Sequence, residues 1–108
     1  MRIAVAASAP NQTQPVAQHG ARAEFYLVFD ETASTHEALE NPFKDYPKSV
    51  GIHVADFLAD KSIDLVVAGR FGAGFARALD AKGVRYKELH GTIEDIVKDL
   101  LGSADPSE

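Results

Sequence analysis

The sequence predicts an α/β domain built on a five-stranded mixed sheet with helices on both faces. Residues 65–68 form an aliphatic run without polar alternation, which is typical of a strand covered on both faces near the middle of a sheet. Strand-like and helix-like stretches alternate along the second half of the chain, as they do in parallel βαβ units. Because such crossovers are right-handed, we expect a strand order of about 3-2-1-4-5, with the second strand antiparallel.

The composition favours a single compact domain. The chain has 108 residues, 45% of them hydrophobic, and this length leaves no room for a second domain. We expect one domain over residues 1–102 and a disordered tail over residues 103–108. A net charge of -5 with interspersed acids and bases argues against nucleic acid and membrane surfaces as partners. The start of the chain lacks a signal-peptide pattern and no apolar run has membrane length, which predicts a cytoplasmic protein.

The first half of the chain predicts three strands and one long loop. Residues 2–7 and 24–30 are rich in β-branched, aromatic or small apolar residues and are expected to be strands. A hairpin turn at Glu31 and Thr32 should lead into a short antiparallel edge strand over residues 34–39. Residues 8–20 form a loop with two prolines, and a loop of this length in a small domain is more often functional than idle.

The second half predicts three helices and two further strands. The prolines within residues 40–47 make that segment irregular. Apolar residues then recur at intervals of three and four, Gly83 stops the second helix, and Thr92 is a suitable N-cap for the third. The expected helices cover residues 49–61, 73–82 and 93–101, and the expected strands cover residues 65–68 and 84–89.

A glycine-rich turn follows the central strand. Gly69, Gly72 and Gly74 permit close approaches that a Cβ would block, and the next helix would direct its free N–H groups at an anionic ligand. The spacing G-x-x-G-x-G matches neither the dinucleotide fingerprint nor the P-loop. A tight turn without a ligand is an equally good interpretation.

The expected topology places the candidate site at one sheet edge. The carboxyl ends of the first, fourth and fifth strands would bring Ser8, the glycine turn and His90 together beside the loop that carries His19 and Arg22. We therefore expect these segments to surround one cavity. The chain has no cysteine, so only histidine, carboxylates and the backbone remain as ligands for a metal group.

Several short motifs follow one another in a characteristic order along the chain. They are Arg2-Ile-Ala-Val, Gly20 with Phe25 and Asp30, Glu40-Asn41-Pro42, Val67-Ala68-Gly69 with Phe71-Gly72, and Gly91-Thr92-Ile93-Glu94-Asp95. Their order resembles that in the dinitrogenase iron-molybdenum cofactor biosynthesis family, which includes the NifX-type and NafY-type carriers and the C-terminal domain of NifB. The resemblance covers nearly the whole chain. At the place where the family has His-Phe-Gly, this chain has Gln18-His19-Gly20, so its histidine is displaced by one position.

The resemblance implies a ribonuclease-H-like domain that binds iron-sulfur-based cofactors or their precursors. Such a domain passes them between cofactor-assembly or nitrogenase-type proteins without catalysing a reaction. Arginine side chains and turn amides suit an anionic cluster or its organic acid. The candidate cofactor-binding residues are His19, Arg22, Gly69, Arg70, Phe71, Gly72, Ala73 and His90, with His19 also as the metal ligand.

Each candidate also has a simpler interpretation. His19 is a ligand or a solvated loop residue, and the arginines hold an anion or pair with nearby acids. His53 falls on an apolar helical stripe and is expected to be a core histidine bonded to a backbone carbonyl, whereas His36 is expected to be exposed.

Two function classes follow from the sequence. The first is a non-enzymatic binding or carrier module in metallocofactor assembly. The alternative is a regulatory or protein-interaction domain of the same fold that binds a partner or a small anion and no metal. A ribonuclease-H-like nuclease is disfavoured because the first strand has no carboxylate, and Asp30 with Asp64 forms no evident metal-binding set.

Overall fold

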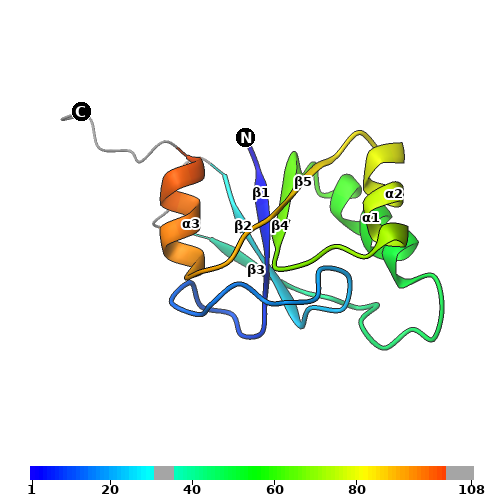
Figure 1. Cartoon of the computed structure of the whole chain (residues 1–108), viewed down its shortest axis with the longest axis horizontal. Helices are drawn as coiled ribbons and strands as arrows, with labels where there is room; N and C mark the ends of the chain where they lie inside the picture. The colour runs from blue at the N-terminus through cyan, green and yellow to red at the C-terminus, as the bar shows by residue number, and fades with distance from the viewer. Residues whose placement is uncertain (31–35, 102–108) are drawn as a thin grey trace.

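The computed structural model describes residues 1–30 and 36–101 of the chain (Figure 1). Within these ranges, five strands and three helices follow one another along the chain in the predicted order. The strands are β1 (Ile3–Ala7), β2 (Phe25–Phe29), β3 (Glu37–Glu40), β4 (Leu65–Ala68) and β5 (Arg85–Glu88), and the helices are α1 (Val50–Asp60), α2 (Ala73–Ala81) and α3 (Ile93–Leu100).

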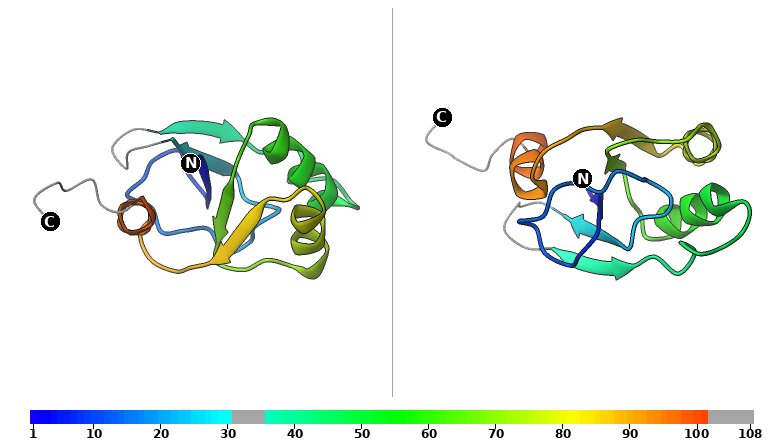
Figure 2. Two further views of the ribbon diagram at one scale, coloured as in Figure 1. Left: turned by 90° about the horizontal axis from the view of Figure 1, so that it is seen from above. Right: turned by 60° about the horizontal axis from the view of Figure 1, so that its bottom comes forward.

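The sheet has the order β3-β2-β1-β4-β5, as predicted. Strand β1 pairs antiparallel with β2 and parallel with β4, and β2 pairs antiparallel with β3. Strand β5 continues the sheet parallel to β4. The prediction that the second strand runs against the others is therefore confirmed, and β3 and β5 form the two edges (Figure 2).

Helices cover both faces of the sheet (Figure 2). Helices α1 and α2 pack on one face over a core that includes Ala4, Ala6 and Val66. Helix α3 packs on the other face over a core that includes Ile3 and Val67. Alternate strand residues thus enter two separate cores, which explains why the central strands are apolar at every position.

Helices α1 and α2 approach each other closely at Gly51. A Cβ at this position would lie 2.8 Å from the Cα of Phe75, so only glycine allows this distance between the two helices. The stripe of apolar residues on α1 could be predicted from its spacing, but the need for glycine depends on the partner helix.

The first and last residues of most elements differ from the predicted ones by one to three positions. Strand β3 begins at Glu37, and the side chain of the N-cap Thr92 makes no capping hydrogen bond. The backbone N–H groups of Ile93 and Glu94 instead donate to the carbonyls of Gln14 and Gln12, at 2.9 Å each. The predicted hairpin turn at Glu31 and Thr32 and the predicted tail at 103–108 lie outside the described residues.

Among the described residues, no helix is both long enough and apolar enough to cross a membrane.

Candidate functional site

The loop between β1 and β2 runs along the carboxyl ends of the parallel strands. The N–H of Ala17 donates to the carbonyl of Ala6 at 2.8 Å, and the N–H of Gly69 donates to the carbonyl of Ala17 at 2.9 Å. The N–H of Val16 donates to the carbonyl of Gly91 at 2.9 Å. The loop is therefore bonded to the ends of β1 and β4 and to the segment after β5, which are the three segments that the topology predicted to meet.

A second set of contacts joins this loop to the glycine turn. The N–H of Gly20 donates to the carbonyl of Arg70 at 3.1 Å, and His19 bridges to Arg70 in parallel pairing. A Cβ at Gly20 would lie 3.0 Å from the Phe75 ring, and a Cβ at Gly69 would lie 2.8 Å from Oε1 of Gln18. Glycine at both positions allows the loop to pack directly against the turn.

A buried polar pair holds the part of the loop that carries the candidate side chains. Nδ2 of Asn41 donates to the carbonyls of Ala21 and Ala23 at 2.9 and 3.0 Å. The Tyr26 hydroxyl donates to the carbonyl of Gly20, and burial raises the pKa of this tyrosine above its ordinary value. Sequence reasoning missed both residues, although Asn41 belongs to the motif that precedes Pro42.

A hollow of about 280 Å³ lies where the loop meets the glycine turn; we call it the arginine hollow. Its two cationic side chains come from different segments, Arg22 from the loop and Arg70 from the turn. Nη1 of Arg22 donates to the carbonyl of Lys44 at 2.7 Å, and Arg70 has no carboxylate partner among the described residues. The hollow is lined by His19, Gly20, Ala21, Arg22, Arg70 and Gly72.

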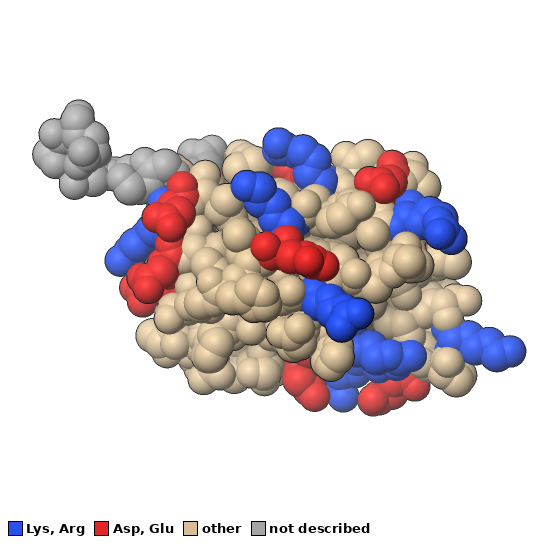
Figure 3. Space-filling model, viewed as in Figure 1, with Lys and Arg blue, Asp and Glu red and all other residues tan. Residues whose placement is uncertain are grey.

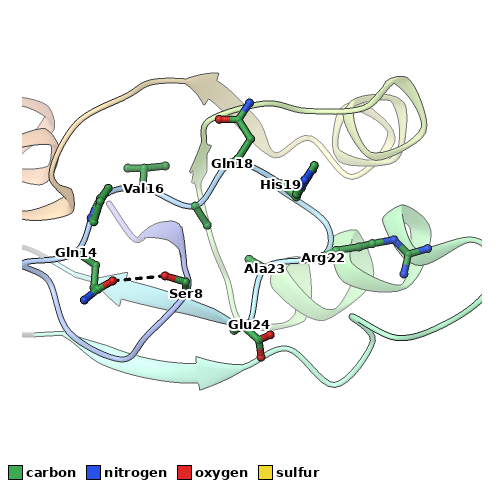
Figure 4. Close-up of a pocket in the computed structure, with 10 residues that line it drawn as sticks. Ser8, Gln14, Val16, Gln18, His19, Arg22, Ala23 and Glu24 are labelled. Atoms are coloured by element: carbon green, nitrogen blue, oxygen red, sulfur yellow. Dashed lines mark hydrogen bonds between the residues drawn. The ribbon is translucent and has the colours of Figure 1, made fainter.

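A second hollow of about 420 Å³ adjoins the first and shares His19 and Arg22 with it. Its lining includes Gln14, whose Oε1 accepts a hydrogen bond from the Ser8 hydroxyl at 3.4 Å (Figure 4). Figure 4 shows the Arg22 side chain extending away from this pair. The two hollows therefore differ in character: two arginines line the first, whereas the second has one arginine together with Ser8, Gln14 and Glu24.

Positive side chains gather at one part of the surface although the whole chain is acidic. Figure 3 shows Lys and Arg side chains close together at the lower right of this face, beside a smaller number of acidic ones. The net charge of the chain is -5, so this local excess does not follow from the composition. Guanidinium groups such as those of Arg22 and Arg70 favour anionic ligands.

One backbone amide of the glycine turn, just before the N-cap of α2, is already bonded within the protein. The N–H of Phe71 donates to Oε2 of Glu88 at 2.9 Å, and the Phe71 ring is buried against Phe75 and Tyr86 at centroid distances of 5.5 and 5.1 Å. Glu88 was missed by sequence reasoning. The signal lies in the sheet register, which places Ala68 opposite Glu88 and so brings an acid to the end of β4.

Of the three glycines in the turn, only Gly69 allows a close approach that a Cβ would block, as was predicted for all three. Gly72 is the N-cap of α2 with φ -71°, and neither Gly72 nor Gly74 has an atom within 4 Å of an added Cβ. Ala73 is the first residue of α2 and is exposed. Open space in front of Gly72 leaves the helix start accessible from the arginine hollow.

His90 does not line the arginine hollow, in contrast to the predicted single cavity. It is exposed just after β5, and its neighbour Gly91 is bonded to Val16 of the loop. The structure thus places His19, Arg22, Arg70 and Gly72 around one hollow and His90 apart from them. Their roles in binding stay a prediction.

Two further histidines differ from expectation. His36 is half-buried, with Nδ1 3.1 Å from Oε1 of Gln12 and its ring 5.4 Å from that of Phe29. His53 is half-buried and stacks on the Phe43 ring at 5.3 Å, and no carbonyl bond to its ring occurs among the described residues. Both rings have structural contacts, so neither is a free ligand near the hollow.

The described residues hold no group of three or more His, Cys, Asp and Glu side chains that could bind a metal ion. His19 is exposed and is the one histidine that lines the arginine hollow. A metal cluster in this hollow would therefore find at most one imidazole from the lining residues, together with arginine and backbone donors.

Comparison with known proteins assigns the chain to a family. The family model described as dinitrogenase iron-molybdenum cofactor matches residues 1–103. The chain belongs to this family. The resemblance predicted from the order of the motifs is confirmed. Membership relates the chain to cofactor binding or assembly. No curated protein matches the chain significantly.

Solved structures confirm the α/β fold of this family member. The apo form of the orange protein from Desulfovibrio gigas is 28% identical, with a TM-score of 0.84 over 94% of this chain and 88% of that chain. The protein PH0822 is 20% identical, with a TM-score of 0.80 over 94% and 91% of the two chains. A putative NifB protein from Thermotoga, placed in the DUF35 family, is 23% identical, with a TM-score of 0.76 over 95% and 88%.

Proposed function

We propose that this protein is a non-enzymatic binding or carrier module for an iron-sulfur-based cofactor or its precursor, of the iron-molybdenum cofactor type. The observation that carries the proposal is the arginine hollow, where Arg22 and Arg70 from separate segments lie beside His19 and the start of α2. Iron-sulfur clusters of this type are anionic, and charge-assisted hydrogen bonds from guanidinium groups suit their sulfur and organic-acid oxygen atoms.

The residue types favour binding that can be reversed. The chain has no thiolate, and the lining of the hollow offers one imidazole, so a cluster would be held mainly by charge and hydrogen bonds. Cysteine ligation would retain a cluster far more firmly. Weak ligation is what a carrier needs, because the cargo must leave for the next protein. We propose cofactor-assembly or nitrogenase-type proteins as the donors and acceptors.

The adjoining hollows provide room for a cargo larger than a single ion. Their volumes of about 280 and 420 Å³ lie within or near the range typical of small-molecule sites, and His19 and Arg22 border both. The polar lining around Gln14 suits an organic acid attached to the cluster, while the arginines suit the cluster itself. His19 would then be the ligand at the junction.

The second candidate is a regulatory or protein-interaction domain that binds a small anion and no metal. The contact between Glu88 and Phe71 favours it, because one amide of the glycine turn is already bonded to a carboxylate of the protein and is not available to a cluster. A small oxyanion would need only the two guanidinium groups. The two candidates differ in whether the anion must contain iron and sulfur.

An anaerobic titration with isolated iron-molybdenum cofactor tests the proposal, with visible absorption as the readout and inorganic phosphate as the competing probe. We expect the wild type to bind and Arg22→Ala and Arg70→Ala each to bind at least about tenfold more weakly, since a charge-assisted bond contributes roughly 1.5–3 kcal/mol. Arg77→Ala removes an exposed α2 arginine that does not line the hollow and should bind like the wild type. Phosphate binding without cofactor binding would support the second candidate instead.

A further inference from the structure

Strand β5 has an unpaired outer side. The N–H groups of Arg85 and Leu89 donate inward to Asp64 and Ala68, at 3.1 and 3.0 Å. Because alternate residues of a strand direct their backbone groups to opposite sides, the N–H and C=O groups of Tyr86 and Glu88 point outward. Among the described residues, no strand pairs with this side of β5 (Figure 2).

A hollow of about 420 Å³ borders this edge; we call it the β5 hollow. Leu65 and Leu100 contribute apolar surface to it, and Arg85 and Lys87 contribute two positive charges against the one carboxylate of Asp80, which bonds to the Tyr86 hydroxyl at 3.4 Å. It lies at the amino ends of β4 and β5, whereas the arginine hollow lies at the carboxyl ends of the parallel strands. The two sites are therefore separate.

The two cations of β5 lie on one face of the sheet. Arg85 and Lys87 are two residues apart, and their register partners Leu65 and Val67 belong to the core under α3. Both are exposed, and neither has a carboxylate partner among the described residues. Arg85 bonds only weakly, from Nη2 to Sδ of Met1 at 3.3 Å.

We propose that β5 binds an extended segment of a partner protein that carries acidic side chains at alternate positions and adds to the sheet as a further strand. The outward groups of Tyr86 and Glu88 would bond to its backbone. Its acidic side chains would face Arg85 and Lys87 across the new strand pair, on the face where Leu65 and Leu100 border the β5 hollow. This inference is independent of the proposed cofactor role.

A second copy of the chain fits this edge less well. The other edge strand, β3, is acidic, with Glu37 and Glu40 exposed. These residues are three apart, so they point to opposite faces of the sheet and cannot meet Arg85 and Lys87 together. A partner with acids two residues apart matches both cations.

A binding experiment with a short synthetic peptide that alternates glutamate and valine tests the inference on the full chain. We expect fluorescence anisotropy to show binding by the wild type and at least tenfold weaker binding by the double variant Arg85→Glu, Lys87→Glu. The matched control is Lys48→Glu, Arg77→Glu, which makes the same charge change at exposed residues away from β5. This control should bind the peptide like the wild type.

Two further measurements separate strand addition from simple charge attraction. A peptide with methylated backbone nitrogens keeps its charge but loses its donors, and it should not bind. The amide protons of Tyr86 and Glu88 should become protected from hydrogen exchange when the unmodified peptide binds. Absence of wild-type binding, equal binding by the charge-reversed variant, or equal binding of the methylated peptide would each overturn the proposal. Self-association of the wild type through β5 would also overturn it, since the occupant would then be a second copy.

Discussion

Replacement of Asn41 by alanine should destabilise the fold and loosen the loop that forms the arginine hollow. The Asn41 side chain is buried, with 4% exposure, and it donates to Ala21 and Ala23 and accepts from the N–H of Phe43 at 3.0 Å. Alanine would leave three backbone groups without these partners. At about 1 kcal/mol for each lost bond, with a larger cost where water cannot enter, we expect a loss of about 2–4 kcal/mol.

Urea denaturation followed by circular dichroism measures this loss, and a thermal scan should show a midpoint lower by about 10–25 °C. The matched control is Asn11→Ala, an exposed loop asparagine that bonds only to Thr13 within its own turn among the described residues. The control should stay within about 0.5 kcal/mol of the wild type. A loss below about 1 kcal/mol for Asn41→Ala would show that water or a rearranged loop replaces the amide, and the assigned positioning role would then be wrong.

Four further predictions follow from single contacts. Burial raises the pKa of Tyr26, so its contribution to the free energy of unfolding is complete below pH 10. Above pH 10 this free energy should fall by about 1.4 kcal/mol per pH unit. Tyr26→Phe should reduce this loss of stability at alkaline pH in denaturation curves. Gly72→Val should keep the melting temperature but weaken cofactor binding at least about tenfold in the anaerobic titration, and unchanged binding would place the ligand elsewhere. Glu88→Ala should strengthen anion binding by freeing the Phe71 amide, which a titration with phosphate can contradict. Val67→Asp should give no folded protein in circular dichroism, because its side chain is fully buried and an unpaired charge there costs several kcal/mol.

The sheet order could be predicted because each strand is marked by its own local pattern. The aliphatic run of β4 indicates a central strand, and the helical stripes on either side require right-handed crossovers. Those two constraints leave few topologies, and the structure has the expected one. Val66 and Val67 are fully buried for the same reason.

The supports of the candidate site could not be predicted because they depend on contacts between distant segments. The sequence around Asn41 predicts only an irregular segment, yet the Asn41 side chain is bonded to carbonyls about twenty residues away. The carbonyls of Gln12 and Gln14 replace a side-chain cap at the start of α3, and backbone atoms leave no mark in the sequence. The exposure of His36 was misjudged for a related reason, since its neighbours come from the long loop.

The contact between Glu88 and Phe71 removes one amide of the glycine turn from the donors that a ligand could use. Sequence rules treat the start of a helix after glycines as an open anion site, and they consider one segment at a time. The parallel register of β4 and β5 sets Glu88 beside the end of β4, where its carboxylate accepts the Phe71 amide proton. The turn therefore presents Arg70 rather than the Phe71 amide to a ligand. If a ligand binds in the arginine hollow, as proposed, its selectivity would depend on the guanidinium groups of Arg22 and Arg70. The Arg22 guanidinium donates to the carbonyl of Lys44, and the backbone carbonyl of Arg70 accepts from the N–H of Gly20.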